Sequence, residues 1–135
     1  MTTIPTASFS HIRVHDAMHQ GIISVAPETP LRAVAQVMAE QRIHAVAISS
    51  AGNGVRPPGI VTALDVVAAA ASDEDRTAGE SAATELLSIS TSERLDHAAK
   101  LMAEHELSHL IVTDAASGLP IGVLSTLDIL AAYGG

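Results

Sequence analysis

Two short segments of the chain place a carboxylate three residues after a hydroxyl side chain: Thr62-x-x-Asp65 and Ser125-x-x-Asp128. Each follows a short aliphatic run and precedes an alanine- and leucine-rich stretch, which predicts a strand leading into a helix. A helix N-terminus attracts phosphate, a hydroxyl there adds a donor, and a carboxylate can accept hydrogen bonds from both hydroxyls of a ribose. The same spacing is nearly that of a capping box, which needs no ligand. Both interpretations stay open at this point.

Three histidines are spaced four residues apart, at His11, His15 and His19. On a continuous helix their imidazoles would share one face and could bind zinc or nickel. Nothing in the sequence predicts a helix throughout this stretch, so we expect a solvated or pH-sensitive face and no metal site. The chain has no cysteine, which excludes a disulfide scaffold, a thiol nucleophile and an iron–sulfur site. No serine-hydrolase, P-loop or zinc-protease motif occurs, so we expect no catalytic residues and no enzyme activity.

The composition favours a folded protein and argues against nucleic acid and membrane as partners. The 135 residues are 47% hydrophobic, carry a net charge of −8 and include one Phe and one Tyr. There is therefore no basic stripe for phosphates and no aromatic platform for bases. No apolar run reaches the roughly 20 residues of a membrane span, and residues 1–10 lack the apolar core of a signal peptide. We expect a cytoplasmic protein.

Much of the sequence occurs twice at an offset of 64 residues. Residues 31–40 lie over 95–104, and residues 23–25 lie over 87–89. One extra residue in the loop 52–58 then changes the offset, so that residues 59–67 lie over 122–130. The apolar pattern and the Gly, Ser/Thr and Asp positions persist in both copies. A match of this length at one offset indicates an internal repeat.

Each copy predicts the same order of elements, β-α-β-β-α, and hence a mixed α/β fold. The expected elements are a strand (21–25; 87–89), a helix from Leu31 or Leu95 with apolar residues at i, i+3, i+4 and i+7, a strand (45–49; 110–113), a hairpin loop (51–58; 115–120), a strand (59–62; 121–125) and a short helix from about Leu64 or Leu127. We expect Thr29 and Ser92 to cap the first helices, with Pro30 at the first helical position. The expected organisation is an N-terminal segment (1–13), repeat 1 (14–71), a linker (72–77), repeat 2 (78–131) and a tail (132–135).

The order of these segments, present twice, resembles a tandem pair of cystathionine-β-synthase-type (CBS) domains, also called a Bateman module. The resemblance covers about residues 14–131 and is carried by Asp16-Ala-Met18, Val25-x-Pro27, Ile43-His-Ala-Val, Leu107-Ser-His-Leu and the two segments Gly59 to Asp65 and Gly122 to Asp128. It implies two repeats related by a pseudo-twofold axis, with sheets packed against helices and two clefts between the repeats. Such clefts commonly bind adenosine compounds, many pairs form disc-shaped dimers, and the family is typically regulatory.

The resemblance also implies which residues line each cleft, because the ribose motif of one repeat faces the strands of the other. Carried over, the first cleft joins Thr62, Asp65, Leu87, Leu107, Ser108 and His109, and the second joins Ser125, Asp128, Ile23, Ile43 and His44. The aliphatic residues would sandwich an adenine, although an ordinary core role fits them equally. His109 matches a position where many members carry a basic residue near phosphate. Its counterpart is Ala45, so the first cleft is expected to bind phosphate better.

The ligand is expected to be an adenosine compound, with AMP, ADP, ATP and S-adenosylmethionine as candidates and no cofactor required. No matched cleft position carries Arg or Lys, so AMP or S-adenosylmethionine suits the clefts better than a triphosphate. The output would pass through a separate effector protein. The alternative is a ligand-free dimeric interaction module in which the Ser/Thr-x-x-Asp segments are only caps. In both cases residues 66–71 and 129–132, apolar nearly all round, predict a homodimer.

Overall fold

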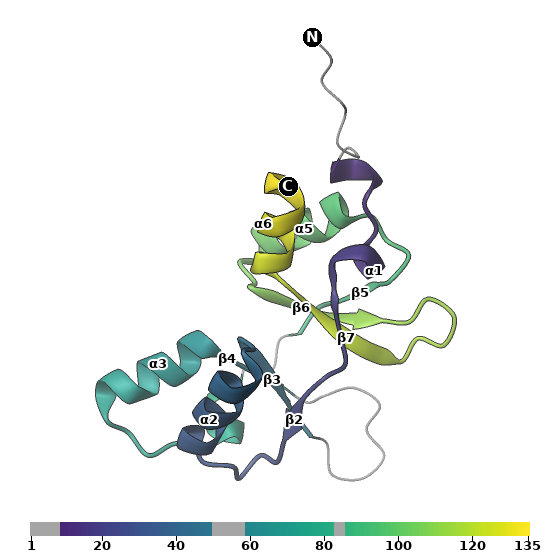
Figure 1. Cartoon of the computed structure of the whole chain (residues 1–135). Helices are drawn as coiled ribbons and strands as arrows, with labels where there is room; N and C mark the ends of the chain where they lie inside the picture. Colours follow the sequence, from purple (N-terminus) through teal and green to yellow (C-terminus); the bar gives the residue numbers. More distant parts are fainter. Residues whose placement is uncertain (1–8, 50–58, 83–85) are drawn as a thin grey trace. The chain divides into compact units, whose positions relative to one another are not determined.

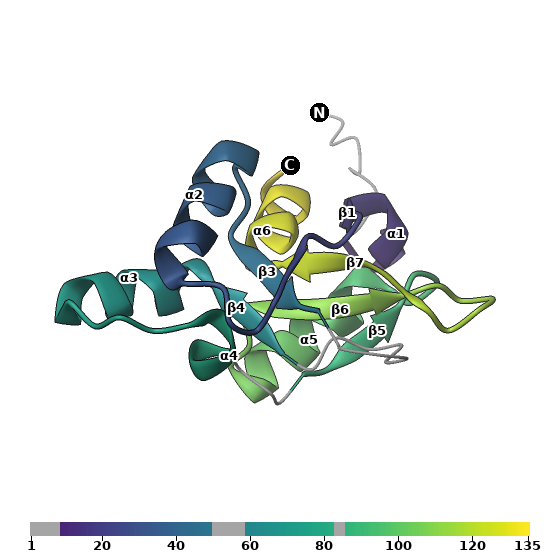
Figure 2. The ribbon, with the colours of Figure 1, turned by 90° about the horizontal axis from the view of Figure 1, so that it is seen from below.

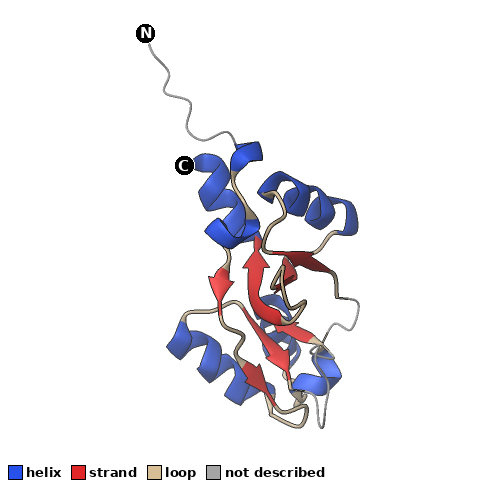
Figure 3. Ribbon diagram, turned by 90° about the vertical axis from the view of Figure 1, so that its right-hand side faces the viewer, coloured by secondary structure: helices blue, strands red, loops and turns tan. Residues whose placement is uncertain are grey.

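The computed structural model describes residues 9–49, 59–82 and 86–135; the expected hairpin loop at 51–58 lies outside them. The chain divides into two compact units. Residues 22–86 form one, here called the first-repeat unit. Residues 1–21 and 87–135 form the other, here called the second-repeat unit. Figure 1 colours the elements along the chain, and Figure 3 separates helices from strands.

The first-repeat unit has a three-stranded sheet in the order β2-β3-β4, with β2 parallel and β4 antiparallel to β3. Its elements are β2 (Ser24–Val25), α2 (Leu31–Gln41), β3 (Ala45–Ile48), β4 (Ile60–Thr62), α3 (Ala63–Ser72) and α4 (Ala78–Ser81). Helix α2 turns Leu31, Val34 and Met38 toward the sheet, where they pack with Val46, Ile48 and Val61. The i, i+3, i+7 spacing thus builds the core that holds the end of β4 and the start of α3 in place.

The second-repeat unit has a four-stranded sheet in the order β1-β7-β6-β5. Its elements are the 3₁₀ helix η1 (Phe9–His11), α1 (Val14–Ala17), β1 (His19–Gln20), β5 (Ser88–Ser90), α5 (Leu95–His105), β6 (His109–Thr113), β7 (Pro120–Ser125) and α6 (Thr126–Gly134). The core joins Leu95, Ala98 and Met102 of α5 to Leu110 and Leu124 of the sheet. Figure 2 shows α1 and α6 together with β7 of this unit.

The expected order β-α-β-β-α is confirmed in both copies, as β2-α2-β3-β4-α3 and β5-α5-β6-β7-α6. The expected first strand at 21–25 is wrong at its start, because β2 begins only at Ser24. Gly21 has a φ of +87°, which favours glycine, and its N–H donates to the Ile121 carbonyl at 2.9 Å. The turn at Gly21 ends β1, which belongs to the other sheet.

The expected caps of the first helices, Thr29 and Ser92, are also wrong. The N-cap residues are Pro30 and Arg94, and neither makes a side-chain cap hydrogen bond. The Leu31 N–H donates to the Arg76 carbonyl at 2.9 Å, and the Leu95 N–H donates to the Ile12 carbonyl at 2.8 Å. At the start of each helix, a backbone carbonyl that is distant in sequence therefore accepts a hydrogen bond from one of the free N–H groups that a nearby hydroxyl was expected to cap.

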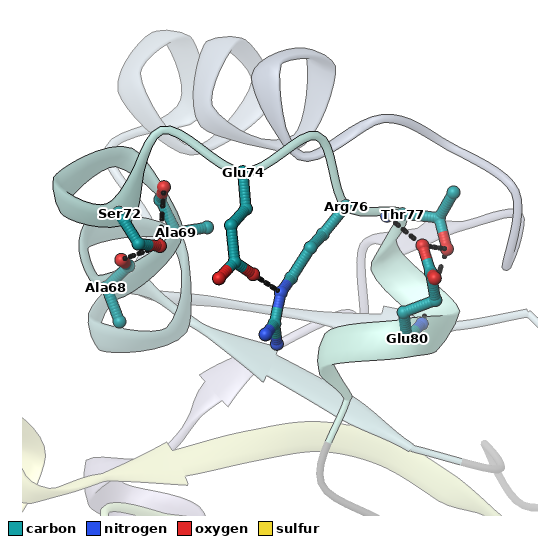
Figure 4. Close-up of polar contacts among 7 residues, drawn as sticks. All are labelled: Ala68, Ala69, Ser72, Glu74, Arg76, Thr77 and Glu80. Atoms are coloured by element: carbon teal, nitrogen blue, oxygen red, sulfur yellow. Dashed lines mark hydrogen bonds and ion pairs between the residues drawn. The ribbon is translucent and has the colours of Figure 1, made fainter.

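Ile12 and Arg76 lie just before two short helices, α1 and α4, that occupy equivalent positions in the two units. Val14 of α1 and Ala78 of α4 lie 64 residues apart and are both fully buried. Helix α1 packs in the core of the second-repeat unit, and α4 packs in that of the first-repeat unit. The acidic connection between α3 and α4, drawn in Figure 4, is held by the Ala78 N–H, which donates to the Thr29 carbonyl at 2.8 Å. The core of the first-repeat unit is thus completed by α4, which precedes the second repeat. The core of the second-repeat unit is completed by α1, which precedes β1.

Each unit also leaves an apolar stripe exposed on its second helix. On α3 the exposed residues are Leu64 and Val67, and on α6 they are Leu127, Leu130 and Tyr133. Within the described residues, no helix is both long and apolar enough to cross a membrane.

Candidate functional site

Thr62 and Asp65 close the N-terminus of α3 as a reciprocal capping box. The Asp65 Oδ2 atom accepts from the Thr62 N–H at 2.8 Å and from the Thr62 hydroxyl at 3.0 Å. The Asp65 N–H donates to Thr62 Oγ1 at 3.4 Å. Among the described residues, no donor contacts the second carboxylate oxygen, Oδ1, of this half-buried residue. One oxygen therefore serves the helix end, and among the described residues the other has no protein donor.

Ser125 and Asp128 form the same box at the N-terminus of α6. Asp128 Oδ2 accepts from the Ser125 N–H at 2.8 Å and from its hydroxyl at 3.1 Å, and the Asp128 N–H donates to Ser125 Oγ at 3.3 Å. Here the carboxylate is buried, and its Oδ1 atom lies 2.9 Å from Nδ1 of His19. The internal hydrogen bonds of the two boxes are alike. The boxes differ in the described residue that contacts the outer carboxylate oxygen, which is His19 at Asp128 and none at Asp65.

The same box occurs a third time, outside the two Ser/Thr-x-x-Asp segments. At the start of α4, Glu80 Oε1 accepts from the Thr77 N–H at 2.8 Å and from the Thr77 hydroxyl at 3.0 Å, as Figure 4 shows. The backbone and side-chain hydrogen bonds from Thr77 hold the pKa of Glu80 below its ordinary value. The capping interpretation of the motif is therefore correct for its internal bonds. Any ligand function of Asp65 or Asp128 depends on the outer oxygen.

The residues that lead into the middle strands lie beside these helix ends within each unit. The Ala63 N–H donates to the His44 carbonyl at 2.8 Å, and Ala45 pairs with Thr62. In the second-repeat unit the Thr126 N–H donates to the Ser108 carbonyl at 3.0 Å, and His109 pairs with Ser125. This adjacency follows from the antiparallel pairing and could have been inferred from the expected hairpins. It gives each Ser or Thr a neighbour on the adjoining strand.

His109, the expected phosphate residue, is half-buried, and its Nδ1 lies 2.8 Å from the hydroxyl of Ser108. These two side chains are neighbours in the chain and contact each other, and their place in one cleft stays a prediction. In the first-repeat unit, the residue that corresponds to Ser108 is His44, whose side chain is exposed. The residue that corresponds to His109 is Ala45. The first residue of the middle strand is therefore a histidine, His109, in the second-repeat unit and an alanine, Ala45, in the first-repeat unit.

The aliphatic candidates divide between core and surface. Leu87 and Leu107 pack against the core of the second-repeat unit, and Ile43 packs against that of the first-repeat unit. Ile23 is 38% exposed. The first expected cleft takes Thr62 and Asp65 from one unit and its other members from the second unit, so the grouping across units stays a prediction.

The histidine row at the N-terminus does not form a shared helical face. His11 lies in η1, His15 in α1 and His19 in β1, so three different elements carry the three imidazoles. In the parts of the chain that the structure describes, no three His, Asp or Glu side chains gather in a way that could hold a metal ion. His19 contacts Asp128 and His15 contacts Asp16 instead.

The first-repeat unit also contains a pocket that the sequence did not indicate. Its volume is about 750 Å³, and it lies between α2, α3 and the connection that leads to α4. Apolar atoms of Ala35, Val66 and Ala69 line its floor, while Asp73, Glu74 and Asp75 border it. Thr62 and Asp65 are not among its lining residues, so this pocket is separate from the capping box.

Comparison with known proteins identifies the repeat. The family model described as "CBS domain" matches residues 14–72 and again residues 80–135. No curated protein matches the sequence significantly.

Several solved structures share the fold. One is the CBS domain pair of protein MJ0100 in complex with 5′-methylthioadenosine and S-adenosyl-L-methionine, with 22% identity, a TM-score of 0.78 and coverage of 91% of this chain and 96% of that one. Another is the CBS domain protein PAE2072 from Pyrobaculum aerophilum complexed with AMP, with 23% identity, a TM-score of 0.75 and coverage of 92% and 100%. A third is Hypoxic Response Protein I with two coordinated zinc ions, with 27% identity, a TM-score of 0.66 and coverage of 88% and 97%.

Proposed function

Because the chain belongs to the CBS domain family and carries two CBS domains in tandem, we propose that it is a regulatory module that binds an adenosine compound. The observation that carries this proposal is the outer oxygen of Asp65, which no described donor contacts, at the N-terminus of α3. A carboxylate placed there can accept a hydrogen bond from a ribose hydroxyl while its other oxygen keeps the helix capped. MJ0100 and PAE2072, which share the fold, bind adenosine compounds.

In the proposed first cleft, Asp65 binds the ribose and His109 lies near the phosphate. The family resemblance supplies this grouping, and the half-buried imidazole of His109 supplies a donor suited to an anion. Leu87 and Leu107 would contact the adenine with the parts of their side chains that are not buried in the core of the second-repeat unit. With His109 as the single basic group at the proposed positions, AMP or S-adenosylmethionine is the proposed ligand class.

We also propose that the chain is a homodimer and acts on a separate effector protein. The exposed stripes of Leu64 and Val67 on α3 and of Leu127 and Leu130 on α6 support the dimer, because such residues are normally covered. Analytical ultracentrifugation at micromolar concentration is expected to give twice the mass of the 13.9 kDa chain. A single species of 13.9 kDa would contradict the dimer.

Titration calorimetry with AMP tests the ligand proposal from the side of the ligand. AMP is expected to bind, and 2′-deoxy-AMP is expected to bind about tenfold more weakly, since it lacks one hydroxyl that a carboxylate would accept. Equal affinity for the two compounds would contradict the ribose role of a carboxylate. If AMP, S-adenosylmethionine and adenosine all fail to bind, the second candidate function holds.

That second candidate is a ligand-free interaction module. The Thr77–Glu80 box favours it, because the same hydroxyl–carboxylate pair caps α4 outside the two repeated Ser/Thr-x-x-Asp segments. The two functions make opposite predictions for the AMP titration.

A further inference from the structure

Both carboxylate oxygens of Asp128 contact a polar group: Oδ2 is hydrogen-bonded to Ser125, and Oδ1 makes an ion-pair contact with His19. Oδ2 accepts from the backbone and hydroxyl of Ser125, and Oδ1 lies 2.9 Å from Nδ1 of His19. Only 6% of the Asp128 side chain is exposed, against 76% of the His19 side chain. The imidazole therefore covers the carboxylate from the solvent side, at the oxygen that a ribose hydroxyl would need.

The backbone of the second-repeat unit holds His19 in this place. Strand β1 pairs with β7 through His19 with Val123 and Gln20 with Gly122. The Gly21 N–H donates to the Ile121 carbonyl at 2.9 Å and fixes the end of β1. A Cβ atom at Gly122 would overlap the His19 carbonyl oxygen and the Met18 side chain. Glycine at position 122 thus allows the close approach of β1 that brings His19 to Asp128.

The first-repeat unit has no imidazole at the matching sequence position. The residue 64 positions after His19 is Ala83, whose side chain cannot donate a hydrogen bond. Ala83 lies outside the described residues. Among the described residues, no donor contacts the outer oxygen of Asp65, whereas His19 contacts the outer oxygen of Asp128.

We propose that His19 is a specificity-determining residue that competes with the ribose hydroxyls for Asp128 and so makes the two nucleotide sites unequal. AMP binds first at the Asp65 site, and it binds at the Asp128 site only when the imidazole leaves the carboxylate. Since the His19 side chain is largely exposed, it can rotate into solvent while β1 stays paired. This inference rests on the proposed binding of an adenosine compound.

The test uses a background in which the open site is removed, Asp65→Asn in the full chain. In this background, His19→Ala is expected to raise AMP affinity by about three- to tenfold in calorimetry, since it removes one partly screened ion-pair contact with the carboxylate. The matched control is Gln20→Ala, which changes the neighbouring exposed residue of β1 and is expected to leave AMP affinity unchanged. Thermal unfolding of each variant checks that the fold persists.

The ligand analogue separates competition from a general structural effect. The gain from His19→Ala is expected to be smaller for 2′-deoxy-AMP, because that compound offers the carboxylate one hydroxyl fewer. An equal gain for both compounds, or no gain for AMP, would overturn the role of His19 while leaving the binding proposal in place. Failure of the wild type and of every variant to bind AMP would overturn the binding proposal together with this inference.

Discussion

In the first-repeat unit, a pocket of about 750 Å³ lies between α2, α3 and the acidic connection that starts at Asp73. In the second-repeat unit, the residue 64 positions before Asp73 is Phe9, which packs against the core and meets Tyr133 edge to face at 5.4 Å. The backbone contacts are shared, since the carbonyls of Arg76 and Ile12 accept hydrogen bonds from the first N–H of α2 and of α5, respectively. The two repeats therefore share backbone contacts and differ in their side chains, with an aromatic pair in the second-repeat unit and charged residues in the first-repeat unit.

The candidate site shows the same divergence. The capping boxes of Asp65 and Asp128 have matching internal bonds. His19 contacts only the second, and His109 lies beside the strand pair of the second-repeat unit, where the first-repeat unit has Ala45. Function is therefore expected to differ between the repeats through the residues around the motif, and not through the motif itself.

The largest effect on stability is expected from Phe9→Ala. Removing this half-buried ring leaves a gap against α5 and α6 and is expected to lower the free energy of unfolding by about 2 kcal/mol. The matched control is Asp75→Ala in the corresponding connection of the first-repeat unit, with an expected change within about 0.5 kcal/mol. Urea unfolding of both variants measures the difference. Equal effects would show that the aromatic anchor does not distinguish the units.

A smaller effect is expected from His109→Ala on ligand binding. Removal of one donor near the phosphate is expected to weaken AMP binding by about fivefold while adenosine binding stays the same. His44→Ala, at the start of the middle strand in the first-repeat unit, serves as the control and is expected to leave the tighter AMP site unchanged. Calorimetry with AMP and adenosine measures both variants. Loss of adenosine binding in His109→Ala would point to a structural role for the imidazole.

The smallest effect is expected from acid on helix α4. Thr77 holds the pKa of Glu80 below its ordinary value, so the folded chain binds this proton less tightly than the unfolded chain. The stabilisation is present at neutral pH and is lost as the pH falls below about 4. The protection factor of the Glu80 amide, which is the intrinsic exchange rate divided by the observed rate, is expected to fall in this range. In Thr77→Ala this pH-dependent loss of protection should disappear; its persistence would contradict the cap as the cause.

The parts of the fold that sequence predicted depend on local pattern. The internal repeat and the apolar spacing that begins at Leu31 and at Leu95 predict the first helix of each repeat. The Gly-to-Asp segments predict the strand-to-helix junctions at Thr62 and Ser125. The helix caps at Thr29 and Ser92 were mispredicted because Arg76 and Ile12, distant in sequence, supply the acceptors instead. The contact of His19 with Asp128 spans more than a hundred residues and follows from the pairing of β1 with β7, which no local pattern indicates.

The most direct test of the account compares Asp65→Ala with Asp128→Ala in AMP titrations of the otherwise unchanged chain. We expect Asp65→Ala to weaken the tighter AMP site by at least about tenfold, because a charge-assisted acceptor is lost, and Asp128→Ala to change that site by less than about twofold. Glu80→Ala, which disrupts a box of the same geometry, is expected to leave AMP affinity unchanged. Equal losses in the two Asp variants, or a larger loss in Asp128→Ala, would contradict the unequal roles of the two repeats.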